Sequence, residues 1–166
     1  MKRLAAALAV LLLAACAPVA NGPGPDAPGD PTFSATLERT ACFGTCPIYR
    51  VTITADGKVV FEGIRFVAAV GRREGQADPA KLAALIALVD SSRFMSLKPQ
   101  YRAQVTDLPS QVVTITRNGR THRVEDYAGR AVGMPEDVAR LEALIDEAAK
   151  DGPWVGDREL FTGAPR

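Results

Sequence analysis

Apolar residues in the middle of this chain alternate with polar ones over short stretches, which predicts β-strands. Residues 48–54 and 58–63 have this pattern and are joined by a three-residue loop that ends in Gly57. Glycine there suits a hairpin loop whose last residue is left-handed. The resulting register places Val51 opposite Phe61, so one face of the hairpin is apolar.

A second hairpin is predicted over residues 111–116 and 120–127, because Asn118-Gly119 is a strong signal for a two-residue type I′ turn. This register pairs Ile115 with His122, the only histidine of the chain. We interpret His122 as a partly covered sheet residue rather than a ligand or general base, since no Ser, Cys or carboxylate stands at a recognisable spacing from it.

Two further stretches are predicted as strands. Residues 33–40 alternate and are interpreted as an edge strand. Residues 65–71 hold a continuous apolar run, which indicates a central strand covered on both sides.

Residues 98–110 have little pattern. They form either a structured crossover between helix and strand or, because long loops in compact domains are often functional, a binding loop. The residues that we single out for such a loop are Tyr101, Thr106, Asp107 and Pro109.

Two helices complete the pattern. Asp78-Pro79 supplies an N-cap followed by proline, and a second helix begins at Pro135 and runs to Lys150. Each has apolar residues three and four positions apart on one face: Leu82, Leu85, Ile86 and Val89 in the first, and Val138, Leu141, Leu144, Ile145 and Ala148 in the second. The predicted fold class is α+β, one domain over residues 33–156 with an antiparallel sheet of about five to six strands and both helices on one face.

The first sixteen residues resemble a bacterial lipoprotein signal peptide. Two basic residues precede an apolar stretch, residues 4–13, which is only about half as long as a membrane span. Leu13-Ala14-Ala15-Cys16 then resembles a lipobox. The resemblance implies removal of residues 1–15, acylation of Cys16 and a lasting membrane anchor. Ala17 rather than Asp follows the cysteine, which implies the outer membrane, facing the periplasm.

Residues 16–32 are interpreted as the acylated cysteine and a tether rich in proline and glycine, with a reach of roughly 45–50 Å. Residues 157–166 are interpreted as a flexible tail. The whole chain has 20 basic and 19 acidic residues, and loss of the two basic residues of the signal leaves 18 against 19, a formal charge of −1. Since no basic stripe is present, nucleic acid is not an expected partner.

Cys42 and Cys46 stand four positions apart in a turn that Gly44 and Pro47 favour. An exported chain permits a disulfide, and a bridge over so short a loop is worth roughly 2 kcal/mol and mainly fixes local shape. A redox-active pair, a metal site and free thiols are the alternatives. The C-x3-C-Pro spacing resembles that of the copper-handling Sco-type proteins, but a strand follows here where that thioredoxin-like fold has a helix.

Several different short motifs are spread along the folded region: the cysteine stretch Ala41 to Tyr49, Asp56-Gly57, Phe61 to Gly63, Phe94 to Leu97, Tyr101, Thr106 to Pro109, and Leu141 to Asp146. Together they resemble the domain-of-unknown-function 6438 family, found in bacterial secreted proteins and lipoproteins. The resemblance runs from about residue 33 to Trp154. It supports a single domain and implies no activity, catalytic residue, metal or cofactor.

The leading hypothesis is therefore a lipid-anchored periplasmic domain that binds an envelope protein or cell-wall component without catalysis. It depends on the anchor, the tether, the small α+β body and the lack of a catalytic constellation in the sequence. The alternative is a thiol-redox or copper-handling protein that uses the C-x3-C pair, with His122 as a further ligand.

Overall fold

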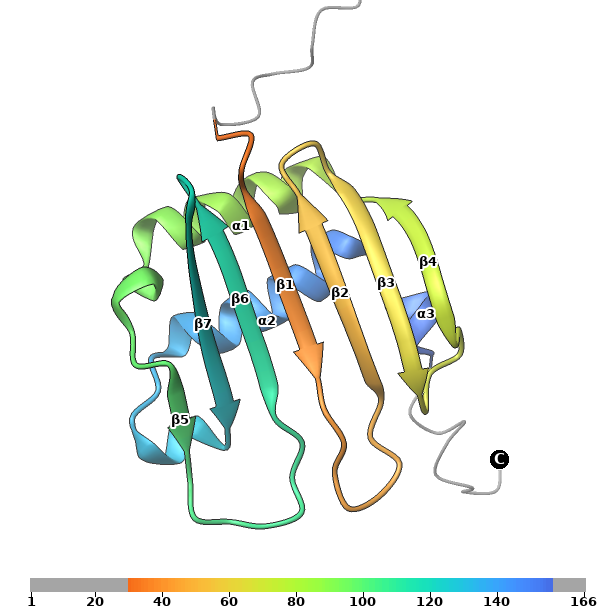
Figure 1. Cartoon of the computed structure of the whole chain (residues 1–166), viewed down its shortest axis with the longest axis vertical. Coiled ribbons are helices and arrows are strands. Elements are labelled where there is room, and N and C mark those ends of the chain that lie inside the picture. Colours follow the sequence, from red (N-terminus) through yellow and green to blue (C-terminus); the bar gives the residue numbers. More distant parts are fainter. Residues whose placement is uncertain (1–29, 157–166) are drawn as a thin grey trace, which may run out of the picture.

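In a computed structural model of the protein, a seven-stranded sheet forms one layer and two helices form a second layer on one of its faces (Figure 1). The structure describes residues 30–156. The predicted signal peptide, Cys16, the tether up to residue 29 and the tail at 157–166 lie outside the described residues.

The sheet has the strand order β4-β3-β2-β1-β6-β7-β5. All neighbours pair antiparallel except β5 and β7, which are parallel. The strands are β1 (Ser34–Arg39), β2 (Ile48–Thr54), β3 (Lys58–Arg65), β4 (Gly71–Gln76), β5 (Gln100–Arg102), β6 (Gln111–Arg117) and β7 (Arg120–Tyr127).

Both predicted hairpins are confirmed with their registers. Val51 lies opposite Phe61, and Ile115 lies opposite His122. The connection between β2 and β3 ends in Gly57 at φ +79°, and Asn118 and its following glycine have φ of +51° and +71°, as a type I′ turn requires.

The two other predicted strands are wrong in part. The stretch at 33–40 forms β1, but β1 is central rather than at an edge, since it pairs with both β2 and β6. The stretch at 65–71 is no strand: β3 ends at Arg65, residues 66–70 turn, and β4 begins at Gly71. Of its apolar run only Val67 is buried in the core, while Val70 is exposed and the backbone N–H of Ala68 donates to the carbonyl of Val155.

The sheet is larger than predicted because of β4 and β5. The residues of β4 are mostly exposed and charged, so no apolar alternation marks them. β5 has only three residues and lies inside the stretch that the sequence left without structure. There Tyr101 is buried and pairs with Asp126 of β7.

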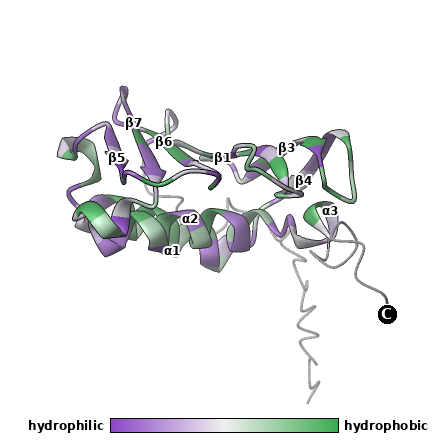
Figure 2. Cartoon of the chain, turned by 90° about the horizontal axis from the view of Figure 1, so that it is seen from below, coloured by the Kyte–Doolittle hydropathy of each residue, from purple (hydrophilic) through white to green (hydrophobic). Residues whose placement is uncertain are grey.

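Two helices cover one face of the sheet, as predicted (Figure 2). α1 (Pro79–Ser91) is capped by Asp78, whose carboxylate accepts from the N–H groups of Ala80 and Lys81 at 3.0 and 3.1 Å. α2 (Glu136–Ala149) begins one residue after Pro135. Shorter segments are η1 (Phe94–Ser96), η2 (Gly129–Val132) and α3 (Gly152–Val155).

The core lies between these two layers and is apolar. The inward residues of the central strands, among them Leu37, Val51, Ile53 and Val113, are fully buried against the helices. The opposite face of the sheet is open and carries threonine and charged side chains. Outward-facing Thr36 and Thr52, for example, bond one another across β1 and β2 at 3.0 Å.

The described chain starts at one end of the sheet. Asp30 accepts a hydrogen bond from the N–H of Asn118, in the β6–β7 turn, at 2.6 Å, and one from the N–H of Thr32 at 2.9 Å. The side-chain bond from Thr32, then the backbone bond from Asn118, lower the pKa of Asp30. We call this the turn end of the sheet, because the two hairpin turns lie there (Figure 1).

Candidate functional site

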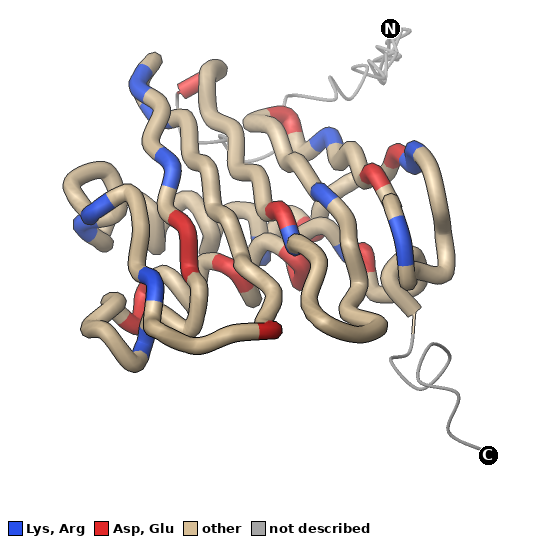
Figure 3. Tube along the Cα trace, turned by 60° about the horizontal axis from the view of Figure 1, so that its bottom comes forward, with Lys and Arg blue, Asp and Glu red and all other residues tan. Residues whose placement is uncertain are grey.

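The opposite end of the sheet, which we call the loop end, carries the long connections. There β1, β3, β5 and β7 finish and β2, β4 and β6 begin. Figure 3 brings this end forward, with basic and acidic positions interspersed along the trace. Two stretches that the sequence singled out, the cysteine turn at 40–47 and the loop at 103–110, both lie at this end.

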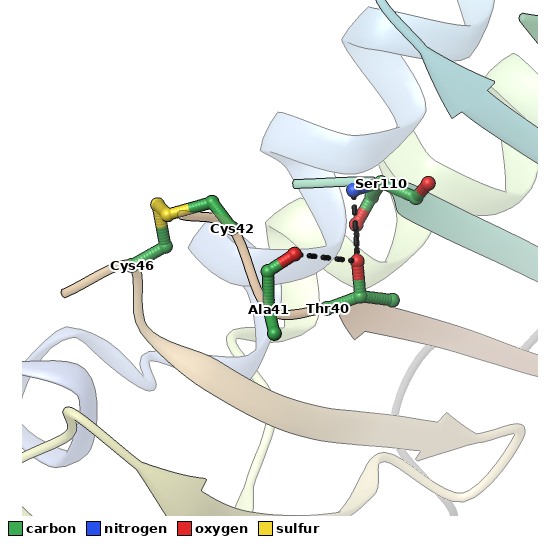
Figure 4. The surroundings of a disulfide bond; sticks show 5 residues. All are labelled: Thr40, Ala41, Cys42, Cys46 and Ser110. Carbon is green, nitrogen blue, oxygen red and sulfur yellow. Dashed lines mark hydrogen bonds between the residues drawn. A yellow bond between two sulfur atoms is a disulfide. The ribbon is translucent and has the colours of Figure 1, made fainter. Parts of the chain in front are cut away.

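The cysteine turn is closed by a disulfide. Cys42 and Cys46 are joined, with their Cα atoms 5.8 Å apart (Figure 4). Gly44 has φ +153°, a conformation that L side chains rarely adopt, and its N–H donates to the carbonyl of Cys42 at 3.0 Å. The bridge therefore fixes a turn that glycine makes possible, and Phe43 at its tip is 88% exposed.

The loop at 103–110 is bonded to the cysteine turn. The N–H of Thr40 donates to the carbonyl of Ser110 at 3.0 Å. The N–H of Ser110 donates to the Thr40 hydroxyl at 2.8 Å, a bond that Figure 4 shows. Farther out, the N–H of Phe43 donates to the carbonyl of Asp107 at 3.2 Å. The two segments thus form one continuous rim.

The four residues predicted for the binding loop differ in burial and position. Tyr101 is a core residue of β5, whereas Thr106 and Asp107 are exposed on the rim. Asp107 has φ +71°, which explains how the loop turns there. Of these four residues, Pro109 is the one that lines a pocket, which Cys46 of the cysteine turn also lines.

That pocket has a volume of about 280 Å³ and opens between the rim, the sheet and the C-terminal segment. Its apolar walls are Pro47, Pro109 and Val155, and its polar groups come from Arg39, Tyr49, Gln111 and Asp146. A second hollow of about 320 Å³ between the helices has polar residues in its lining too, but three of these bond within their own helices: Ser91 and Ser92 to carbonyls of α1, and Asp137 to Arg140. A concave site with a few convergent polar groups is the usual form of a ligand site, so the first pocket is the candidate.

Arg39, Tyr49 and Asp146 form a bonded group at the pocket. The Arg39 Nε donates to the Tyr49 hydroxyl at 2.8 Å, its Nη2 donates to Asp146 at 2.6 Å, and the Tyr49 hydroxyl donates to the other Asp146 oxygen at 3.0 Å. Burial alone would lower the pKa of Arg39, but the charges of Asp146 and Tyr49 and the hydrogen bonds to both residues together outweigh burial and raise that pKa. Burial and then the charge of Asp146 raise the pKa of Tyr49.

Strand register brings this group together. Arg39 lies opposite Tyr49 on β2 and opposite Gln111 on β6, so all three point to the face that α2 covers. Asp146 follows buried Ile145 on α2. No site role was predicted for these residues from the sequence, although Tyr49 and Asp146 end two of the motifs that resemble the family. One signal was available: Arg39 continues the inward alternation of Ala35 and Leu37, and charge at a core-facing position indicates a partner or a function.

Two more carboxyl groups are buried behind the pocket. Asp151 is 3% exposed and Glu142 is 8% exposed. Burial, then the charge of Asp146, raises the pKa of Asp151 to about 8. Burial, then the charge of Asp126, raises the pKa of Glu142 to about 7. Because burial and the neighbouring Asp146 both disfavour the charged form of Asp151, this carboxyl retains its proton at pH 7, below its pKa, and can donate it to Asp146.

His122 lies apart from the cysteines. It sits opposite Ile115 in the middle of β7, its Nε2 is 3.1 Å from the carbonyl of Leu97, and its ring meets Phe94 edge-on. It is thus the half-covered sheet residue that the sequence predicted. Within residues 30–156 no three His, Cys, Asp or Glu side chains are grouped to hold a metal ion.

Large apolar side chains are exposed around the loop end. Phe43, Val105 and Leu108 belong to the two bonded segments of the rim, and Ile64, Val70 and Val132 lie in the neighbouring connections or at a strand end. Of these six exposed large apolar residues of the described chain, only Phe43, Val105 and Leu108 share the bonded rim, so the rim is the candidate interaction surface.

The fold is a two-layer α+β domain with a disulfide-closed turn beside a polar pocket. The family described as "Domain of unknown function (DUF6438)" matches residues 34–149. The chain belongs to this family, as its motifs indicated. No curated protein matches the chain. None of the helices over residues 30–156 has the length and apolar content needed to cross a bilayer.

Proposed function

We propose that this protein is a lipid-anchored envelope protein, held in the outer membrane through Cys16 and facing the periplasm, whose domain is a non-catalytic binding module for an envelope protein or cell-wall component. The observation that carries the proposal is the loop end. A polar pocket there is bordered by exposed apolar side chains, Phe43 and Leu108 among them.

The arrangement of the two ends supports this role. The chain enters the domain at the turn end, where Asp30 is bonded to the β6–β7 turn. A tether that joins the domain there is attached at the end of the sheet opposite to the loop end, so it does not cover the loop end. The rim is held by a disulfide and backbone bonds, so little conformational freedom is lost when it binds.

The polar groups of the pocket favour binding over catalysis. Asp146 is the carboxylate that lines it, and Asp146 already accepts from both Arg39 and Tyr49. Each oxygen of this carboxylate is therefore already bonded within the protein, and a general base needs an oxygen within hydrogen-bond reach of the substrate proton.

The binding role is tested by photo-crosslinking in intact envelopes. A photoreactive phenylalanine analogue replaces Phe43 at the loop end or, in the control, Thr121 at the turn end. We expect a reproducible adduct from position 43 and none from position 121. Equal adducts from both positions, or no adduct from position 43, would contradict the proposal. Mass spectrometry of the N-terminus tests the anchor separately: the expected product begins at an acylated Cys16, and an unacylated N-terminus refutes the anchor.

A thiol-redox function is the second candidate, because Cys46 is partly exposed and lines the pocket. The reduction potential of the Cys42–Cys46 pair distinguishes the two. A structural disulfide is expected below about −300 mV, whereas a redox-active pair lies well above that value.

A further inference from the structure

Some guanidinium N–H groups of Arg39 have no hydrogen-bond partner among the described residues. A guanidinium carries five N–H groups. Within the described chain one of them donates to Tyr49 and one to Asp146, which leaves three N–H groups for a ligand. The side chain is 26% exposed and lines the pocket. These donors therefore face the space that a ligand would fill.

The guanidinium is also held in place. Its Nε and Nη2 are fixed by Tyr49 on β2 and Asp146 on α2, and Arg39 itself lies on the central strand β1. A planar fork whose orientation is fixed beforehand suits a planar, two-oxygen acceptor, since little side-chain entropy is then lost on binding.

The remaining walls fit the atoms next to such a carboxylate. Gln111 lies opposite Arg39, lines the pocket and is half-buried, and no side-chain hydrogen bond engages it within the described chain. Its amide can accept from an N–H and donate to an oxygen. Pro47, Pro109 and Val155 supply apolar surface for a small side chain.

We infer that this pocket binds the C-terminal residue of a peptide, with the free carboxylate on Arg39, the last amide N–H on Gln111 and the terminal side chain against the proline walls. The preceding residues leave over the apolar rim at Phe43 and Leu108. The inference rests on the proposed binding function and names the ligand class for the same site.

The charges around the pocket favour one negative charge over a cation or a phosphate. Asp146 is already engaged by two donors, which weakens its attraction for a ligand ammonium group. Burial raises the pKa of Asp151 behind it to about 8 and that of Glu142 to about 7, so at pH 7 Asp151 is mostly neutral and Glu142 carries only part of a charge. A phosphate would bring up to two charges to a single arginine that already shares a carboxylate.

The test uses the full-length chain and N-acetylated tetra-alanine peptides, each as the free acid and as the amide, ending in either L- or D-alanine. Binding is followed by calorimetry and by the fluorescence of Trp154, the only tryptophan, which is next to Val155. We expect the acids to bind at least about tenfold more tightly than the amides, since the amide lacks the charged two-oxygen group. Preference for the L end indicates protein C-termini as the source, and preference for the D end indicates cell-wall peptides.

Two variants test whether the peptide carboxylate binds at Arg39. Arg39→Lys keeps the charge beside Asp146 but loses the fork, and we expect it to weaken the acids by about tenfold. The matched control is Arg50→Lys, another strand arginine paired with a carboxylate, Glu38, but on the open face of the sheet; it should leave binding unchanged. If Arg39→Lys does not fold, the acid–amide comparison on the unmodified protein remains decisive.

Equal affinity for acids and amides, or no binding of either, overturns the inference. Unchanged binding by folded Arg39→Lys does so as well. If crosslinking from position 43 still captures a partner in that case, the binding function stands and only the ligand class is wrong. If the peptides do not bind and position 43 also captures no partner, both the ligand class and the binding function are wrong.

Discussion

Replacement of Asp151 by asparagine should stabilise this protein at neutral pH. The buried carboxyl retains its proton in the folded state, where its pKa is raised to about 8, whereas the unfolded chain has the ordinary value of 3.8. The folded state therefore binds the proton more tightly, and stability falls as the pH rises from about 4 to about 8. An asparagine amide can still donate to Asp146 and has no proton to lose.

The size of the effect follows from the pKa difference. About three pH units separate 3.8 from neutral pH, each worth about 1.4 kcal/mol, which sets an upper limit of about 4 kcal/mol. Because the protein and nearby water can relax around a buried charge, we expect roughly half of that, about 2 kcal/mol. The backbone bonds from Trp154 and Val155 to the Asp151 carbonyl remain, and its side chain caps no N–H of α3, so little else is lost.

The assay is thermal unfolding of the protein and of Asp151→Asn between pH 4 and pH 9. We expect equal melting temperatures near pH 4 and a gain of roughly 6–10 °C for the variant at pH 8. Asp137→Asn, at an exposed ion pair with Arg140, is the control and should keep the pH dependence of the parent. A variant that melts no higher than the parent at pH 8 would refute the account of a protonated carboxyl behind the pocket.

Three further outcomes are expected. Reduction of the Cys42–Cys46 disulfide should lower the free energy of unfolding by only about 2 kcal/mol, measured by urea titration, because the closed loop is so short; complete unfolding on reduction would contradict this. Gly63→Ala should destabilise the domain by about 2–4 kcal/mol in the same titration, since the new Cβ would lie 1.9 Å from the carbonyl oxygen of Ala69; a change below about 0.5 kcal/mol would show that the turn has room. Phe43→Ser should change the free energy of unfolding by less than about 0.5 kcal/mol, because the side chain is 88% exposed. It should nevertheless abolish capture of a partner in envelope pull-downs, and undiminished capture would show that Phe43 is not part of the binding surface.

Local sequence was sufficient where the structure depends on local chemistry. The two hairpins follow from alternation and turn residues, so the pairing of Val51 with Phe61 could be predicted without knowledge of the remaining sheet. The cap of α1 at Asp78 is equally local. The central position of β1 could not be predicted in this way, because two-sided pairing depends on which distant strands lie beside it.

The apolar run at 65–71 shows a second limit. Val67 is buried, but it packs beneath the sheet from a turn rather than from a strand. Periodicity cannot distinguish these cases, since a short apolar run records burial and not backbone conformation. The backbone of this turn bonds Trp154 and Val155, nearly ninety residues farther along the chain.

The candidate site was predictable only at its rim. The cysteine turn and the loop ending at Pro109 were singled out from composition, and the structure brings them together. The polar groups inside the pocket were not, because Arg39 and Asp146 meet only through strand register and helix packing. Charge at an inward position of β1 was the one local sign of them.

The most direct test of the account is a ¹H–¹⁵N NMR titration of the full-length chain with the acid peptide that binds best. The account predicts shift changes at the cysteine turn, the 103–110 loop and the segment 152–156, together with the side-chain signals of Arg39 and Gln111. Changes concentrated on the open face of the sheet, around Thr36 and Thr52, would contradict it.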